Sequence, residues 1–206
     1  MVAVPGGSFF GGCKDGGDAS CNDEEPGASM NVAPFRIDRT EVTVAQYREC
    51  VNAGRCPEPD TGNGDTVCNW KKTDRDNHPI NCVDWFQAKF YCEWTGKRMP
   101  TEVEWEKAAR GADARVYPWG SDWSAGKANV SSKGTVPVGS YPPGASPYGA
   151  LDMAGNVWEW VSDRGPGVRG LRGGSWNSPP NLARVFARRS LDPRTRRDDV
   201  GIRCAQ

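Results

Sequence analysis

The residues that most often carry catalytic chemistry are scarce in this sequence. His78 is the only histidine among the 206 residues. The chain alone therefore cannot build an iron site of the kind that needs two histidines and a carboxylate. A serine hydrolase is also excluded, because no Gly-x-Ser-x-Gly segment is present to carry the nucleophile. Redox or soft-metal chemistry would have to come from cysteine.

Cysteine is abundant, and its spacing favours disulfides over a metal site. The eight cysteines form three short-range pairs and leave two over: Cys13 with Cys21, Cys50 with Cys56, Cys68 with Cys82, and then Cys92 and Cys204. Eight cysteines allow many connectivities, so the pairing stays open at this point. A zinc site is the alternative, although the chain has no Cys-x-x-Cys pair and a single histidine. Disulfides predict an oxidising compartment.

Composition predicts one compact domain over residues 1–206. The sequence has no long apolar run, so no direct membrane insertion is expected. The 25 glycines, 16 prolines and nine tryptophans indicate a loop-rich fold with an aromatic core, in which strand and turn outweigh helix. Residues 1–6 lack the basic start and apolar stretch of a signal peptide. With the cysteines, this leads us to expect a trimmed form of a secreted, periplasmic or surface-anchored protein.

Charge is balanced overall but uneven along the chain. Acidic and basic residues number 26 each, which argues against nucleic acid as a partner. From Arg169 onward there are nine arginines, no lysine and three aspartates. These guanidinium groups are expected to form bidentate pairs with carboxylates elsewhere in the fold, and an anion-binding patch is the alternative.

Local patterns predict one strand and three helices. Residues 35–43 alternate apolar and polar side chains, as a half-buried strand does. Residues 55–78 show no periodicity and are expected to form a loop held by Cys56 and Cys68. Three helix starts carry the capping-box pattern, in which a side chain and a residue three positions later satisfy each other's backbone amides. They are Thr43 with Gln46, Asp84 with Gln87, and Thr101 with Glu104.

Several motifs occur together in a fixed order. They are GKRMPTEVEWEKAARG (96–111), YPWG (117–120), YGALDMAGNVWEW (148–160), LRGGSW (171–176) and the closing GIRCA (201–205). In this order and spacing the chain resembles the formylglycine-generating enzyme or sulfatase-modifying-factor family over essentially its whole length. The resemblance implies an α+β fold of the C-type-lectin-like variety, loop-rich, with short sheets and two or three helices. It also implies a structural hydrogen-bonding role for His78 in place of general-base catalysis.

The resemblance identifies the position where catalysis should lie, and the catalytic residues are absent there. The family's oxidases hold Cu(I) between two cysteine thiolates, which are soft ligands suited to that ion. Counting from Trp176, the equivalent positions are Ser178 and Ala183. A hydroxyl and a methyl group cannot replace two thiolates, so no copper is expected. The resemblance also implies a disulfide between Cys92 and Cys204.

A calcium site is the second implication of the resemblance. Family members bind calcium through two side chains and two backbone carbonyls, which correspond here to Asp152, Gly155, Val157 and Glu159. Calcium prefers oxygen ligands, and a tight glycine turn can direct successive carbonyls at one point. The alternative is a turn whose acids pair with arginines. A second family site would begin at Asn129, but residues 131–134 supply no acid, so we expect it to be lost or altered.

The region after Trp176 is the expected ligand surface. In related variable proteins this region is exchanged while the framework around it is kept, and loops on a rigid scaffold often carry recognition. The expected ligand contacts are Trp176, Asn177, Ser178, Asn181, Val185 and Phe186. The alternative is that Pro179 and Pro180 simply fill a groove that has lost its function.

Together these features predict a non-catalytic, calcium-stabilised extracytoplasmic domain that binds a protein, peptide or glycan. Two alternatives stay open. The first is an oxidoreductase of the same family that uses a different metal or cysteine arrangement. The second is a structural appendage of a larger chain.

Overall fold

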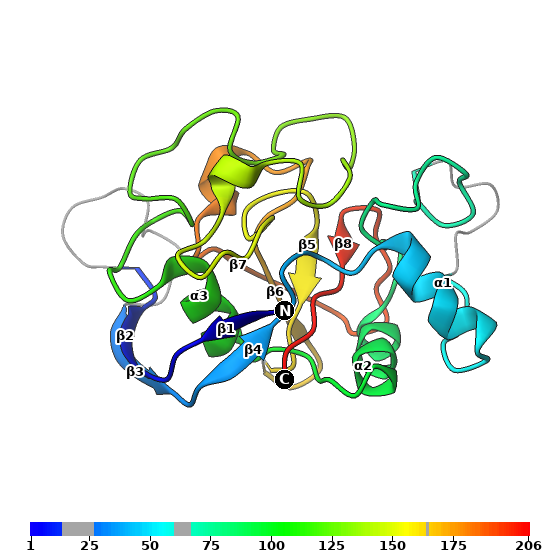
Figure 1. Ribbon diagram of the computed structural model, residues 1–206, viewed down its shortest axis with the longest axis horizontal. Coiled ribbons are helices and arrows are strands. Elements are labelled where there is room, and N and C mark those ends of the chain that lie inside the picture. The colour runs from blue at the N-terminus through cyan, green and yellow to red at the C-terminus, as the bar shows by residue number, and fades with distance from the viewer. Residues whose placement is uncertain (14–26, 60–66, 164) are drawn as a thin grey trace.

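The computed structural model describes residues 1–13, 27–59, 67–163 and 165–206. Within these residues, short helices and strands are joined by long loops (Figure 1). The helices are α1 (Val44–Asn52), α2 (Trp85–Trp94) and α3 (Glu102–Arg110), with two 3-10 turns, η2 (Pro142–Gly144) and η3 (Pro180–Ala183). The loop-rich α+β class with short sheets is confirmed. In the described part of the chain no helix is long and apolar enough to cross a membrane.

The strands form two pairs and one four-stranded sheet. They are β1 (Val2–Val4), β2 (Gly7–Gly11), β3 (Ala28–Val32), β4 (Phe35–Ile37), β5 (Trp158–Trp160), β6 (Arg169–Arg172), β7 (Arg188–Leu191) and β8 (Val200–Gly201). β1 pairs with β4 and β2 with β3, both antiparallel. The larger sheet has the order β7-β6-β5-β8, in which β5 and β8 are parallel. Every residue of β5 is buried, so this strand is the centre of the fold.

Each helix begins at its predicted capping box. At the start of α3 the Thr101 hydroxyl accepts a bond from the Glu104 amide at 3.1 Å, and the Glu104 carboxylate accepts one from the Thr101 amide at 2.9 Å. The same exchange occurs at Thr43 with Gln46 and at Asp84 with Gln87. These contacts satisfy amides that the first helical turn leaves without partners.

The expected strand over residues 35–43 is shorter than predicted. Regular pairing stops at Ile37, although Asp38 N and Val42 N still donate to the carbonyls of Cys204 and Ile202 at 2.8 Å each. The chain bends after Ile37 and turns Glu41 into the interior. The alternation of apolar and polar residues could not predict this bend, because Glu41 accepts hydrogen bonds in the interior from Asn156 and Val157, which lie far away in the sequence.

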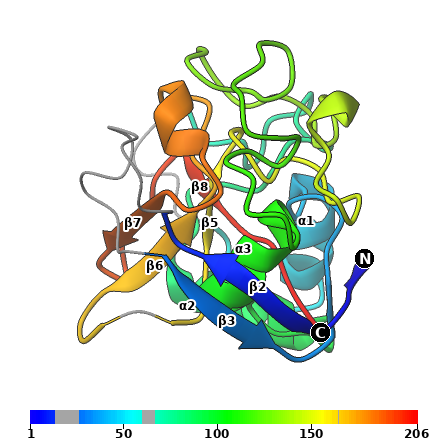
Figure 2. The ribbon, with the colours of Figure 1, turned by 90° about the vertical axis from the view of Figure 1, so that its left-hand side faces the viewer.

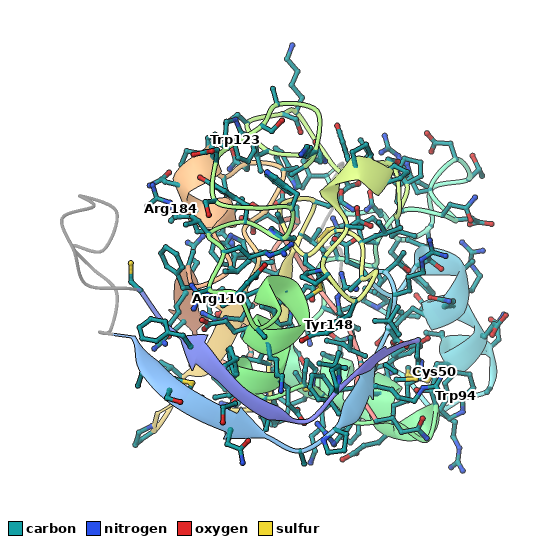
Figure 3. The ribbon with its side chains drawn as sticks, turned by 60° about the vertical axis from the view of Figure 1, so that its left-hand side comes forward. Cys50, Trp94, Arg110, Trp123, Tyr148 and Arg184 are labelled. Carbon is teal, nitrogen blue, oxygen red and sulfur yellow. A yellow bond between two sulfur atoms is a disulfide. The ribbon has the colours of Figure 1, made fainter. Side chains whose placement is uncertain are left out.

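The β2–β3 hairpin lies across α3, and one arginine fastens them together (Figure 2). Arg110 is the last residue of α3 and reaches toward the hairpin (Figure 3). Its Nη1 donates to the carbonyls of Phe10 and Gly12 at 2.6 and 2.8 Å, and to Glu106 at 2.9 Å. Because its guanidinium is buried, these bonds replace the water that it loses on folding.

Three disulfides join six of the seven described cysteines. Cys92 bonds to Cys204, as the resemblance implied, and links α2 to the end of the chain. The other two are Cys50 with Cys56 and Cys68 with Cys82. Cys13 is also disulfide-bonded. The expected pairing of Cys13 with Cys21 involves a residue outside the described ranges.

The arginine-rich end of the chain forms carboxylate pairs, as predicted. The pairs are Arg172 with Glu106, Arg196 with Asp84, Arg197 with Asp199 and Arg203 with Glu159. Arg172 and Arg203 have no exposed side-chain surface. These guanidinium groups hold the fold together and do not form an open cationic patch.

The Cys92–Cys204 bridge should be the most stabilising of the three. It closes a separation of 112 residues, against six for Cys50–Cys56. Because a longer closed loop restricts the unfolded chain more, replacing both Cys92 and Cys204 with alanine should lower the free energy of unfolding by roughly 2 to 5 kcal/mol. The matched Cys50→Ala, Cys56→Ala variant should lose about 2 kcal/mol less. Urea unfolding of both variants tests this, and an equal or reversed order contradicts it.

Candidate functional site

The turn before β5 has a backbone conformation that few non-glycine residues adopt. Asp152, Gly155 and Asn156 have positive φ angles of 56°, 79° and 63°. A side chain at Gly155 would place its Cβ 2.3 Å from the carbonyl oxygen of Asn129, so only glycine fits there. The Asn156 amide in turn donates to that same carbonyl at 2.9 Å. The turn is therefore held against the Asn129 carbonyl by a close contact at Gly155 and a hydrogen bond from Asn156.

The Glu159 carboxylate is buried and already has three bonds. Arg203 donates hydrogen bonds from Nε to Oε2 and from Nη2 to Oε1, each at 2.8 Å. Trp105 Nε1 donates to Oε2 at 2.6 Å. A carboxylate offers about four lone-pair sites. Glu159 can therefore supply at most its Oε1 to a metal ion while it stays paired with Arg203.

Glu41 belongs to the same cluster, although sequence reasoning did not single it out. Its carboxylate accepts from the Val157 amide at 3.2 Å and from Asn156 Nδ2 at 2.8 Å. Burial, and then the charges of Asp152 and Glu159, raise the pKa of Glu41 well above its usual range. Burial is also the main cause of the raised pKa of Asp152. Both raised pKa values favour the protonated, uncharged forms of these two carboxyl groups.

The residues present offer oxygen atoms of the kind that a divalent cation such as calcium takes. Three buried carboxyl groups, those of Glu41, Asp152 and Glu159, act on the single guanidinium of Arg203. A dication bound here would favour their charged forms. No group of three or more His, Cys, Asp or Glu side chains in the described residues is arranged around one point. An ion here would thus need backbone carbonyls as well, and the ligand set of Asp152, Gly155, Val157 and Glu159 stays a prediction.

The expected second calcium region has internal partners. Asn129 Nδ2 donates to the Gly134 carbonyl at 3.0 Å and to Asn156 Oδ1 at 3.2 Å. The following loop is fastened to the Gly-Gly-Ser-Trp segment, because Ser131 N and Ser132 N donate to the carbonyls of Ser178 and Trp176. The loop carries a lysine where acids would be needed.

Ser178 and Ala183 lie in the interior. Ser178 Oγ accepts from the Ser175 amide at 3.0 Å and lies 3.0 Å from the Ser175 hydroxyl. Ala183 ends η3 and has no exposed surface. The two positions that correspond to the family's copper ligands thus hold a hydrogen-bonded hydroxyl and a buried methyl group. Each of the seven described cysteines is in a disulfide.

The expected ligand surface must be corrected. Val185 and Phe186 are 0% and 3% exposed and pack in the hydrophobic core, and Ser178 is 5% exposed. None of the three can contact a ligand at the surface of this structure. Asn177 and Asn181 are exposed, and Trp176 is half-buried. The sequence showed the segment but not which side chains face inward, because the segment has no regular periodicity.

A pocket of about 150 Å³ lies beside Trp176. Among the described residues that line it, three are cations and none is acidic. The lining comprises Val67, Asn69, Lys72, Arg75, Lys133, Gly134, Thr135 and Trp176. Sequence reasoning treated most of these positions as loop. Because they come from three separate segments, only the folded chain brings their charges together.

His78 contacts two residues that line this pocket, Arg75 and Thr135. Its Nδ1 lies 2.9 Å from the Thr135 hydroxyl and 3.2 Å from Arg75 Nη1. Asn69 joins the same network through Thr135, with Nδ2 to Oγ1 at 3.0 Å. Burial, and then the charge of Arg75, lower the pKa of His78. A neutral histidine between these groups fits the predicted structural role.

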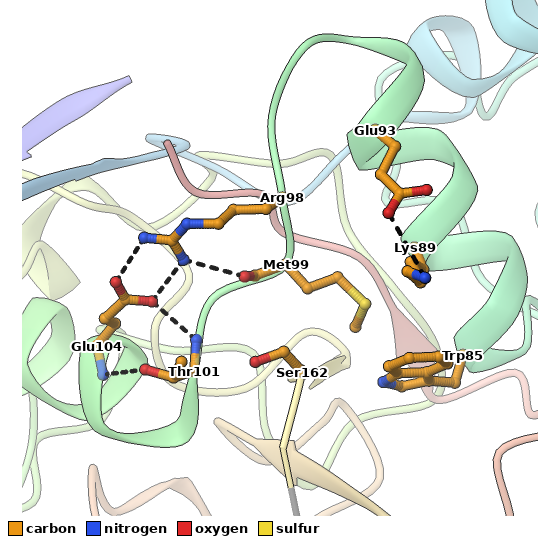
Figure 4. A pocket seen from close by; sticks show the side chains of 8 residues that line it. All are labelled: Trp85, Lys89, Glu93, Arg98, Met99, Thr101, Glu104 and Ser162. Atoms are coloured by element: carbon orange, nitrogen blue, oxygen red, sulfur yellow. Dashed lines mark hydrogen bonds and ion pairs between the residues drawn. The ribbon is translucent and has the colours of Figure 1, made fainter.

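A larger pocket of about 430 Å³ lies between α2 and α3 (Figure 4). Trp85 and Met99 form its apolar wall. Its cations have acidic partners within the pocket, because Arg98 pairs with Glu104 at 2.6 Å and Lys89 with Glu93 at 3.6 Å. The lining therefore has no net charge.

The fold and the motif positions define a domain of the formylglycine-generating type. The family described as "Sulfatase-modifying factor enzyme 1-like domain" matches residues 1–206, and the chain belongs to that family. It is 32% identical to the formylglycine-generating enzyme of Streptomyces coelicolor, covering all of this chain and 88% of the relative. It is 31% identical to "Inactive C-alpha-formylglycine-generating enzyme 2" of Bos taurus, covering all of this chain and 87% of the relative.

A solved structure agrees with this assignment. PvdO from Pseudomonas aeruginosa superposes with a TM-score of 0.82 at 29% identity, covering 98% of this chain and 92% of that one. The family thus includes proteins named for catalysis and proteins named as inactive. Which kind this chain resembles depends on its own site residues.

Arg203 should be far more important for stability than an exposed arginine. Replacing it with methionine leaves Glu159 buried without its partner, which should cost about 3 to 5 kcal/mol of unfolding free energy. Arg98 is the matched control, because its side chain is 47% exposed in its pair with Glu104. Arg98→Met should cost no more than about 1 kcal/mol. Urea titrations in the presence of chelator measure both, and similar losses would refute the structural role of the buried pair.

Proposed function

We propose that this chain is a non-catalytic, calcium-stabilised recognition domain that presents a ligand-binding surface around Trp176. The observation that carries the proposal is the state of the cysteines. All seven described cysteines are disulfide-bonded, and a pair of copper-binding thiolates needs two free ones. Only one cysteine of the chain lies outside the described residues. Ser178 and Ala183, at the positions of the family's copper ligands, cannot supply a thiolate.

The proposed recognition surface follows from what remains exposed. Asn177 and Asn181 offer amide groups that can donate and accept hydrogen bonds, and Trp176 offers a partly exposed ring. They lie on loops held by the rigid sheet, an arrangement suited to binding a protein, peptide or glycan. The similarity to a relative named as inactive supports the proposal that the chain keeps the family's fold without its catalytic activity.

An oxidising, extracytoplasmic location is part of the proposal. Three described disulfides fit a compartment in which thiols are oxidised. A reducing cytosol would leave Cys92 and Cys204 as thiols and would release the covalent link between α2 and the end of the chain.

Copper binding and turnover decide between this proposal and an oxidase. The protein should bind no stoichiometric Cu(I) and should not convert a Cys-x-Pro-x-Arg peptide to formylglycine, because it lacks the thiolate pair. Anaerobic Cu(I) titration and mass spectrometry of the peptide measure the two properties. The Streptomyces coelicolor relative serves as the positive control. Formylglycine formation by this chain would establish the oxidoreductase alternative.

Calcium should stabilise the protein through the turn at Asp152. At a calcium concentration 100 times the Kd, linkage predicts about 2.7 kcal/mol of added stability. The melting temperature should therefore fall when a chelator is added. Asp152→Asn should lose this calcium response because it removes one charged ligand, whereas the exposed Asp122→Asn should keep it. A melting temperature that ignores both calcium and chelator would rule out the site.

A further inference from the structure

Helix α2 carries a row of aromatic side chains on its outer face. Within the described residues, five large apolar side chains are exposed, and three of them, Phe86, Phe90 and Trp94, lie on α2; the other two are Met1 and Val67. The three on α2 are four residues apart, so they follow one another along one side of the helix. Between 37% and 52% of each residue is exposed. We call these three residues the aromatic row.

The opposite face of α2 is already packed against the core. Trp85, Ala88, Tyr91 and Cys92 are buried, and Cys92 also forms the disulfide to Cys204. A helix that is apolar on all sides is typical of a helix with neighbours on all sides. Burial of the aromatic row against another protein surface would therefore be favourable.

Two residues of opposite charge flank the aromatic row on one side. They are Lys89 and Glu93, which lie one turn apart on α2 (Figure 4), with Nζ 3.6 Å from Oε1. Their side chains are 47% and 52% exposed, so both are accessible to a second molecule.

The row and its flanking charges form a pattern that is complementary to itself. In an antiparallel pair of α2 helices with a two-fold axis near Phe90, each side of one helix meets the same side of the other. Phe90 then lies against Phe90 of the partner subunit, and Phe86 lies opposite Trp94 of the partner subunit. Lys89 comes opposite Glu93 of the partner subunit, and the symmetry makes this contact twice. The charges thus favour a second copy of this chain over a partner with another charge order.

We propose that the aromatic row of α2 is the contact surface of a symmetric homodimer, in which a second copy of this chain packs antiparallel against it. Unlike the proposed recognition function, this contact uses only residues of α2. The row exposes roughly 250 Å² of aromatic surface per copy, which is less than the roughly 800 Å² per partner of a standard interface. The dimer is therefore reversible, and its population depends on protein concentration.

Pairing through α2 leaves the proposed recognition segment accessible. The 3-10 turn η3, which includes Asn181, lies in the upper part of both ribbon views, whereas α2 lies in the lower part (Figures 1 and 2). A dimer presents two such segments, and two linked sites bind a multivalent ligand more tightly than one site does.

Sedimentation equilibrium of the 206-residue chain tests the dimer, over concentrations from about 1 μM to about 1 mM, which cover a weak interface. The average mass should rise from the 22.4 kDa of one chain toward twice that value. Phe90→Glu should raise the Kd of the dimer at least about tenfold, because two carboxylates would meet at the two-fold axis. Its melting temperature should match that of the unchanged chain, because Phe90 is half exposed. A mass that stays at one chain throughout, or equal association of the Phe90→Glu variant, would overturn the proposal.

Charge reversal tests the antiparallel register. Lys89→Glu or Glu93→Lys alone places like charges opposite each other twice, and each should raise the Kd about tenfold. The two changes together restore opposite charges across the axis and should return the Kd to within about twofold of the original. Lys133→Glu makes the same charge change on an exposed lysine outside α2, so it is the matched control and should leave the Kd within about twofold. Weakening of the double variant equal to that of the single variants would contradict this register.

Discussion

The buried ion pair between Glu159 and Arg203 is the interaction on which this structure depends. Glu159 lies in the central strand β5, and Arg203 lies near the end of the chain. Besides the carboxylate, the guanidinium bonds to the carbonyls of Asp38 and Leu151, and Trp105 of α3 completes the carboxylate's shell. A buried pair costs several kcal/mol of desolvation unless its remaining bonds are made. Here they are made at three further positions, Asp38, Leu151 and Trp105, so the pair holds the segments of these residues in one arrangement.

The turn before β5 depends on the same arrangement. The turn at Asp152 precedes β5 directly, and Glu41 reaches it from the segment that follows β4. The calcium ion that we propose at this turn would take oxygen ligands from the same segment. The Asn156 amide donates to the Asn129 carbonyl. The loop that follows Asn129 includes Lys133, which lines the pocket beside Trp176. The turn at Asp152 and the pocket beside Trp176 are thus connected through the loop that follows Asn129.

Sequence patterns predicted what is local or shared with the family. The capping boxes were correct because each depends on residues three apart, and the pairing of Cys92 with Cys204 followed from the family resemblance. Val185 and Phe186 were misplaced because an irregular segment carries no period to show which side faces the core. Glu41 and Arg75 were missed for a related reason. Their partners lie far away in the sequence, at Val157 and Thr135, and only the tertiary fold brings them together.

The two positions that correspond to the family's thiolate pair are not a weak point of this scaffold. Ser178 bonds to Ser175 and Ala183 packs without a polar group, so neither side chain leaves an unpaired buried group. The contacts that hold the backbone, the Glu159–Arg203 pair and the Cys92–Cys204 bridge, involve neither position. The proposed absence of catalysis is therefore compatible with a stable fold, because stability rests on other residues.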